Sequence, residues 1–126
     1  MLYDRSMITA SRIASLVILI AIVFVTLSPI GLRPQTGHPG LERAAAYLLL
    51  GATLGIGFSR WIRHALIFIV CVAGVLELLQ FVDPGRHARL GDMLVKAAAG
   101  VIGITLSWFV LRQCRRLNAA WREGAR

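Results

Sequence analysis

The sequence predicts an all-α integral membrane protein, a four-helix bundle whose helices are joined by short loops. Apolar residues make up 57% of the 126 residues and charged residues only 16%, against ~25% charged in a typical soluble domain. The charges are also bunched, which leaves long uncharged stretches between them. A helix that faces lipid is apolar on all sides, whereas a soluble helix needs only one apolar face.

Four stretches fit transmembrane helices, and we expect a single membrane domain over residues 1–126. The predicted spans are about 13–32, 42–59, 65–82 and 93–111, followed by a basic tail over 112–126. The first span has no charge over 20 residues, which is enough to cross ~30 Å of hydrocarbon. The second is the shortest and spans only by including Glu42 and Arg43 or by thinning the bilayer. Because the connections are short, consecutive helices are expected to be antiparallel neighbours.

The start of the first span, with Arg5 and Arg12, also fits a secretory signal peptide. Residues 25–29, Val-Thr-Leu-Ser-Pro, lack the A-x-A-like pattern at which such peptides are cleaved. We therefore expect an uncleaved anchor that ends near Ser28 and Pro29, since Pro and Gly residues punctuate helices.

The net charge of +8 would suggest nucleic-acid binding in a soluble protein. Here the arginines flank the predicted spans, no basic stripe is interleaved with aromatics, and we expect no nucleic-acid partner. One side of the membrane would hold nine basic residues: Arg5, Arg12, Arg60, Arg63, Arg112, Arg115, Arg116, Arg122 and Arg126. The other side would hold five: Arg33, Arg43, Arg86, Arg89 and Lys96. The positive-inside rule then places both termini in the cytoplasm and the loops 31–43 and 83–92 outside.

The cysteines and histidines do not indicate a cofactor or a metal site. Cys71 and Cys114 lie in or at the end of spans, give no disulfide framework, and are expected to pack against other helices. His38, His64 and His87 are scattered over different loops. We expect neither a metal ion nor a cofactor.

Most acidic residues lie at the outer end of the predicted bundle: Glu42, Glu77, Asp83 and Asp92. Glu77 lies within the third span, roughly 7 Å below its end at ~1.5 Å per residue, and Lys96 lies at a similar depth in the fourth. An ionisable group inside a membrane is costly and usually faces a partner within the bundle. We expect Glu77 to pair with Lys96 or with Arg43. Gln80 shares the face of Glu77, and Asp92 shares the face of Lys96.

Glycines follow the same helix faces as these charges. Gly51 and Gly55 continue a stripe from Arg43 and Tyr47, Gly100 and Gly103 continue one from Lys96, and Gly74 precedes Glu77 by one turn. Small residues let membrane helices approach closely, so these stripes are expected to be the mutual faces of the helices. The same faces also offer a route to a homo-oligomer.

The polar residues of the third and fourth spans resemble the VanZ-like membrane proteins. The shared pattern is E-x-x-Q (Glu77, Gln80), then a Pro and an Arg (Pro84, Arg86), then D-x-x-x (Asp92) and a Gly (Gly100). Residues 41–43, Leu-Glu-Arg, look like a variant of the family's Asp-Lys pair. Two positions depart from the family: Lys96 replaces its usual Asn, and Ala46 replaces its usual His. The resemblance covers roughly residues 12–111 and implies a four-helix protein of the cell envelope, in the bacterial inner membrane.

On this basis we expect an outward-facing pocket that binds a lipid-linked or phosphate-bearing envelope ligand, besides contacts with membrane lipids. Its candidate residues are Arg43, Glu77, Gln80, Arg86, Arg89, Asp92 and Lys96. Three alternatives stay open. The chain could be a small membrane enzyme with Glu77 or Asp92 as general base, a non-catalytic assembly or packing subunit, or, least favoured, a proton-coupled carrier. A Glu77–Lys96 pair could also be purely structural and set the helix register.

Overall fold

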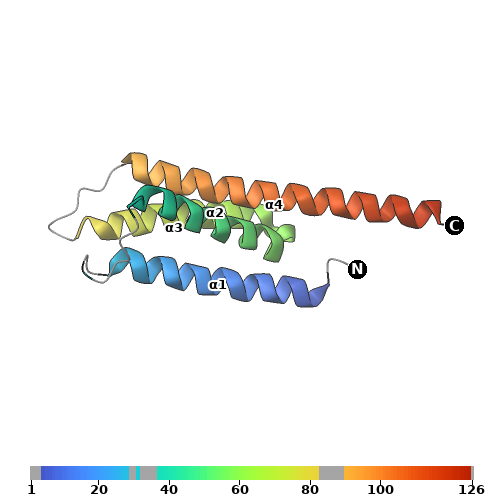
Figure 1. Ribbon diagram of the computed structural model, residues 1–126, viewed down its shortest axis with the longest axis horizontal. Helices are drawn as coiled ribbons and strands as arrows, with labels where there is room; N and C mark the ends of the chain where they lie inside the picture. The colour runs from blue at the N-terminus through green and yellow to red at the C-terminus, as the bar shows by residue number, and fades with distance from the viewer. Residues whose placement is uncertain (1–3, 29–30, 32–36, 83–89, 126) are drawn as a thin grey trace.

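The computed structural model describes residues 4–28, 31, 37–82 and 90–125, and within these the chain is all-α. Four α-helices, α1 (Arg5–Leu27), α2 (Pro39–Gly57), α3 (Ile62–Gln80) and α4 (Leu90–Gly124), run up and down in sequence, with a short 3-10 turn, η2 (Ser59–Trp61), between α2 and α3. Figure 1 shows both termini at the same end of the bundle. The predicted all-α, four-helix fold is thereby confirmed.

The ends of α1 are set by the residues that flank it, Asp4 and Ser28, and not by the limits of its apolar segment. Asp4 caps it by accepting a hydrogen bond from the backbone N–H of Arg5. It ends at Leu27, and Ser28 is extended, with ψ 146°, because a residue that precedes a proline is disfavoured in the helical region. The helix thus begins eight residues before the predicted span 13–32, and its end at Leu27 agrees with the expected end near Ser28 and Pro29. Hydropathy could not show the earlier start, because the first two turns are polar but helical.

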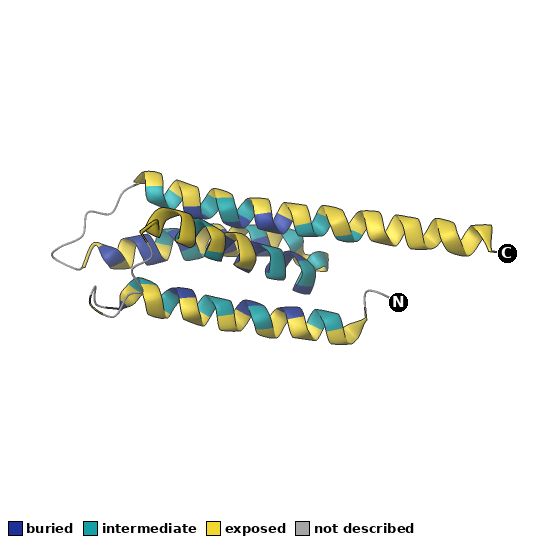
Figure 2. Ribbon diagram, viewed as in Figure 1, coloured by how far each residue is buried: buried dark blue, intermediate teal, exposed yellow. Residues whose placement is uncertain are grey.

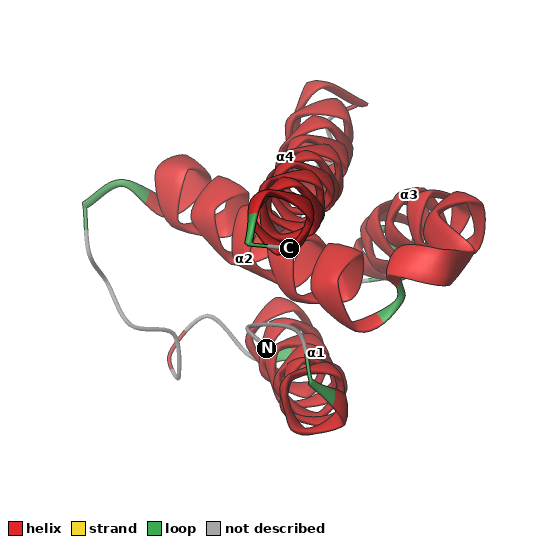
Figure 3. Ribbon diagram, turned by 90° about the vertical axis from the view of Figure 1, so that its right-hand side faces the viewer, coloured by secondary structure: helices red, strands yellow, loops and turns green. Residues whose placement is uncertain are grey.

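α2 begins with Pro39 in its first turn, where the missing N–H of proline costs no hydrogen bond. Gly37 precedes it with φ +75°, a backbone conformation that glycine adopts without strain. In Figure 3 the other helices are seen nearly end-on, whereas α2 crosses the bundle obliquely between α1 and α4.

The most extensive helix contact joins α2 and α4, and there the glycine stripes meet as predicted. A Cβ on Gly51 would collide with the carbonyl oxygen of Gly100, and one on Gly103 with the carbonyl oxygen of Leu48. The two backbones are therefore in direct contact, as small residues permit in membrane helices. Gly74 was expected to line a third mutual face, and this is wrong: a Cβ there would meet nothing within 4 Å.

α1 packs chiefly on α2, and α3 packs chiefly on α4. α2 and α3 contact each other little, so the prediction that all consecutive helices are close neighbours is wrong for this pair. In Figure 3, α3 lies beside α4, and only one end of the obliquely placed α2 comes near it. Buried residues are confined to the inner faces of the helices (Figure 2), where Leu50, Ile69 and Ile104 are completely enclosed.

Three helical segments among the described residues are long and apolar enough to cross a membrane: Arg5–Leu27, Ser59–Gln80 and Leu90–Gly124. The chain is thus a membrane protein by the length and composition of its helices. α2 is not among these three segments; Glu42 and Arg43 in its first turns and its four glycines, Gly40, Gly51, Gly55 and Gly57, lower its hydropathy.

α4 continues well past the predicted fourth span, and the basic tail is helical to Gly124. Its 35 residues reach ~52 Å at 1.5 Å per residue, against ~30 Å of hydrocarbon. Residues 112–125 are exposed throughout. Cys71 and Cys114 are also exposed, so the expectation that they pack inside the bundle is wrong.

Candidate functional site

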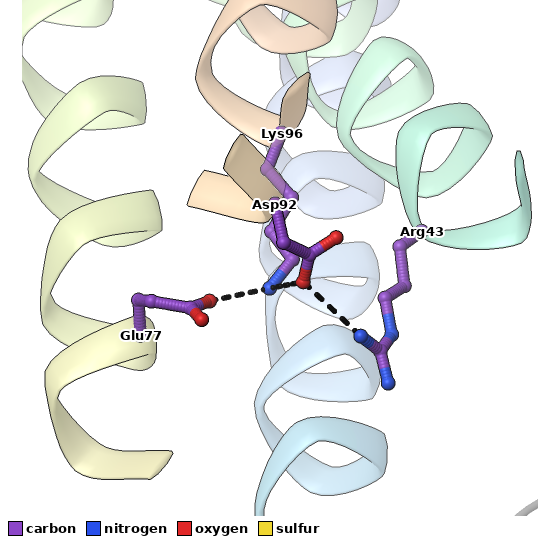
Figure 4. Close-up of polar contacts among 4 residues, drawn as sticks. All are labelled: Arg43, Glu77, Asp92 and Lys96. Atoms are coloured by element: carbon purple, nitrogen blue, oxygen red, sulfur yellow. Dashed lines mark hydrogen bonds and ion pairs between the residues drawn. The ribbon is translucent and has the colours of Figure 1, made fainter. Parts of the chain in front are cut away.

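The ammonium of Lys96 is the centre of a charged cluster at the end of the bundle where α4 begins. Its Nζ lies 2.7 Å from Oε2 of Glu77 and 2.8 Å from Oδ2 of Asp92. The same Oδ2 of Asp92 accepts a hydrogen bond of 3.1 Å from the guanidinium of Arg43. Figure 4 shows these four side chains in one chain of contacts from Glu77 to Arg43. We define these residues, Arg43, Glu77, Asp92 and Lys96, as the charged cluster.

Three helices supply the charged cluster, and the glycine contacts hold them in place. Asp92 and Lys96 are one turn apart on α4, so both project from the same face. Lys96 is followed one turn later by Gly100, which contacts α2 on one side and Ile69 of α3 on the other. The close approach of both helices at Gly100 brings Arg43 and Glu77 within reach of the two α4 residues.

The side chains of the charged cluster become more exposed from the α3 side of the cluster to the α2 side. The side chains of Lys96 and Glu77 are 3% and 7% exposed, those of Asp92 and Arg43 25% and 39%. The predicted pairing of Glu77 with Lys96 is confirmed, whereas Arg43, the alternative partner, contacts Asp92 instead. The ammonium of Lys96 is bound between Glu77 and Asp92 inside the protein.

Gln80 is buried, 8% exposed, one turn after Glu77 on the same helix. Its side chain makes no hydrogen bond to another described residue. Arg86 and Arg89, the other predicted site residues, lie outside the described residues. Whether they approach the charged cluster therefore stays a prediction.

Tyr47 is a further polar residue at this end of the bundle, which the sequence reasoning treated only as part of a helix stripe. It is 2% exposed and interacts electrostatically with Glu77, Asp92 and Arg43. The four-residue step from Arg43 to Tyr47 on α2 could have shown that both face the same neighbours.

A groove of about 290 Å³ between α1 and α2 opens beside the charged cluster, and we call it the α1–α2 groove. Its α1 wall is mostly apolar and includes Val17, Ala21 and Val25. Its other wall carries Glu42, Arg43 and Tyr47 and reaches Lys96. The volume is near the lower bound of small-molecule sites, which are roughly 300–1,000 Å³. Sequence reasoning missed this groove, because it arises from how α1 rests on α2.

The charged cluster has two cations and two carboxylates, so its charges balance. Its guanidinium is the member with the largest capacity for a further ligand. Arg43 makes one hydrogen bond to a described residue, out of the five N–H donors of an arginine side chain. No group of three or more His, Cys, Asp and Glu side chains that could hold a metal ion occurs among the described residues.

Comparisons of this chain with protein-family models, with curated proteins and with solved structures gave no match.

Proposed function

We propose that this chain is a VanZ-like protein of the cell envelope that binds an amphiphilic, phosphate-bearing envelope ligand in the α1–α2 groove. The carrying observation is the composition of that groove, which joins an apolar wall on α1 to the guanidinium of Arg43 and the buried Lys96. A lipid-linked ligand has an apolar chain and a charged phosphate. Its chain would lie along Val17, Ala21 and Val25, and its phosphate oxygens would accept hydrogen bonds from the remaining N–H groups of Arg43.

The charged cluster would position Arg43 for this role. The carboxylate of Asp92 forms an ion pair with the guanidinium of Arg43, and the ammonium of Lys96 forms one with the same carboxylate. A long side chain that is fixed by a carboxylate loses less conformational entropy when it binds a ligand. Arg86 and Arg89 would add cationic contacts from the loop between α3 and α4.

The test is native mass spectrometry of the protein purified in a mild detergent. We expect a bound amphiphile as a defined mass increase, and its occupancy should fall at least threefold in Arg43→Gln. Ala21→Phe, which fills the apolar wall, should lower occupancy as well. The matched controls are Arg116→Gln on the exposed end of α4 and Ile13→Phe on an exposed face of α1. A mass increase that survives both groove variants would contradict the proposal.

The proposal also places both termini in the cytoplasm and the charged cluster at the outer leaflet, as the arginine distribution favours. This orientation is tested with Gly85→Cys in a Cys71→Ala, Cys114→Ala background. Labelling of intact cells by an impermeant maleimide is expected. Labelling only after the inner face is opened would reverse the orientation and move the site to the cytoplasmic leaflet.

A further inference from the structure

A second groove lies at the other end of α1, between the start of α1, the end of α2 and the start of α3. Its volume is about 330 Å³. The inner lining is apolar, with Leu16, Leu19 and Phe68 among its residues, and the polar members are Arg12, Ser15, Trp61 and His64. We call it the Arg12 groove. It shares no lining residue with the α1–α2 groove.

The guanidinium of Arg12 is held in a fixed position at this groove. Its Nε donates a hydrogen bond of 2.9 Å to the carbonyl oxygen of Gly57. The guanidinium carbon also lies 4.9 Å from the centre of the Phe58 ring, a cation–π geometry. Arg12 forms no ion pair with a described residue, so four N–H donors of its terminal nitrogens remain for a ligand.

The residues around the Arg12 groove indicate the level of a membrane surface. Trp61 lies edge-to-face against His64, with ring centroids 5.4 Å apart, and tryptophan is enriched where hydrocarbon meets headgroups. Arg60 and Arg63 are adjacent in sequence to this pair. Within residues 4–28 and 59–68, which cover α1 with its cap, η2 and the start of α3, Asp4 is the one acidic residue. The local charge is therefore positive, unlike the balanced charged cluster.

We propose that the Arg12 groove binds an anionic glycerophospholipid. One acyl chain lies against Leu16, Leu19 and Phe68, and the phosphate contacts the terminal nitrogens of Arg12 beside His64. The apolar lining fits any acyl chain, and the unpaired, fixed guanidinium and the positive surroundings select lipids with net negative charge. This site is separate from the proposed function and does not depend on it.

The experiment uses Trp61 as a reporter in the full chain with Trp108→Phe and Trp121→Phe. The protein is reconstituted in phosphatidylcholine vesicles that contain increasing fractions of brominated phosphatidylglycerol or brominated phosphatidylcholine, which quench tryptophan on contact. We expect half-maximal quenching at a mole fraction of the anionic lipid at least threefold lower than that of the zwitterionic lipid. Salt at 1 M, where the Debye length is ~3 Å, should reduce this ratio.

Variants of Arg12 test whether its guanidinium causes the preference for the anionic lipid. Arg12→Gln should bring the ratio of mole fractions close to one, Arg12→Lys should retain part of the selectivity, and Arg116→Gln should leave it unchanged. Circular dichroism on heating reports whether each variant is folded. If Arg12→Gln is not folded, the proposal is tested by Arg12→Lys and by the effect of salt on the protein that retains Arg12. Equal quenching by both lipids overturns the proposal, as does a selectivity that neither salt nor a folded Arg12→Gln reduces. Absence of quenching by either lipid, together with cross-linked dimers, also overturns it and assigns the groove to a second copy of the chain.

Discussion

The two sides of α2 are packed in different ways. Towards α4, backbone meets backbone at Gly51 and Gly100, and the interface ends in the charged cluster. Towards α1, the contact leaves a groove at each end, the α1–α2 groove and the Arg12 groove. The α2–α4 side therefore has one well-defined arrangement, whereas the α1 side leaves space that membrane amphiphiles can fill. We expect stability to depend mainly on the α4 side and ligand binding mainly on the α1 side, with Arg43 and Lys96 taking part in both.

The largest effect on stability is expected from the charged cluster. Removing one member of a buried ion pair costs ~3–5 kcal/mol in soluble proteins, and about 3 kcal/mol is expected for Lys96→Asn because polar groups in membranes find substitute partners. In Glu77→Gln with Lys96→Asn, two amides replace the charged pair, and the loss should be clearly smaller than the sum of the two single losses. Thermal unfolding in detergent provides this double-mutant cycle. Simple additivity would show that the 2.7 Å contact contributes no coupling, and Arg116→Asn is the control.

An intermediate effect is expected where the backbones touch. Gly51→Ala adds one Cβ against the carbonyl oxygen of Gly100, which forces α2 and α4 apart, and overpacking of this kind costs ~1–3 kcal/mol. Gly74→Ala is the matched control, since its Cβ meets open space and alanine favours a helix over glycine by up to about 1 kcal/mol. The two variants should change the unfolding temperature in opposite directions. A similar change for both would mean that α2 and α4 are not in direct contact.

The smallest effect is expected on the α1 side. Ser11 donates a hydrogen bond of 2.8 Å to the carbonyl oxygen of Thr53, and Ser11→Ala removes it. A neutral hydrogen bond contributes ~0.5–1.5 kcal/mol, so a decrease of only a few degrees in unfolding temperature is expected. Thr105→Ala is the control, since the hydroxyl of Thr105 bonds only to carbonyls of its own helix. A loss as large as that of Gly51→Ala would show that α1 is as tightly fixed as α4.

Sequence reasoning predicted the parts of the molecule that depend on charge and size. Glu77 was expected to pair with Lys96 or with Arg43, because an ionisable group is costly in hydrocarbon, and the structure selects Lys96. The glycines beside them indicated which helices approach closely. Gly74 shows the limit of this argument, since a glycine on the right helix can still face open space.

The unpredicted parts depend on how whole helices are oriented. α2 runs obliquely along α4, and hydropathy contains no information on that angle. The two grooves, and the pairing of Arg43 with Asp92, depend on how the helices are placed in space, which the sequence pattern did not give. The early start of α1 and the long extension of α4 were missed for another reason: a helix can continue beyond the apolar segment that crosses the membrane.

The ion pair between Glu77 and Lys96 has a consequence for biogenesis. A translocon presents each segment to lipid in turn, and a charged residue at the centre of a helix raises the cost of insertion by ~2.5–3.5 kcal/mol. Glu77 lies near the end of α3 and Lys96 near the start of α4, so the cost for each is expected to be below this range, and the two residues are only 19 positions apart in the chain. If the two helices partition as one hairpin, the charges neutralise each other before either faces lipid. The nascent chain would then be held at the translocon until α4 has emerged from the ribosome, and truncation before Lys96 would leave α3 poorly integrated.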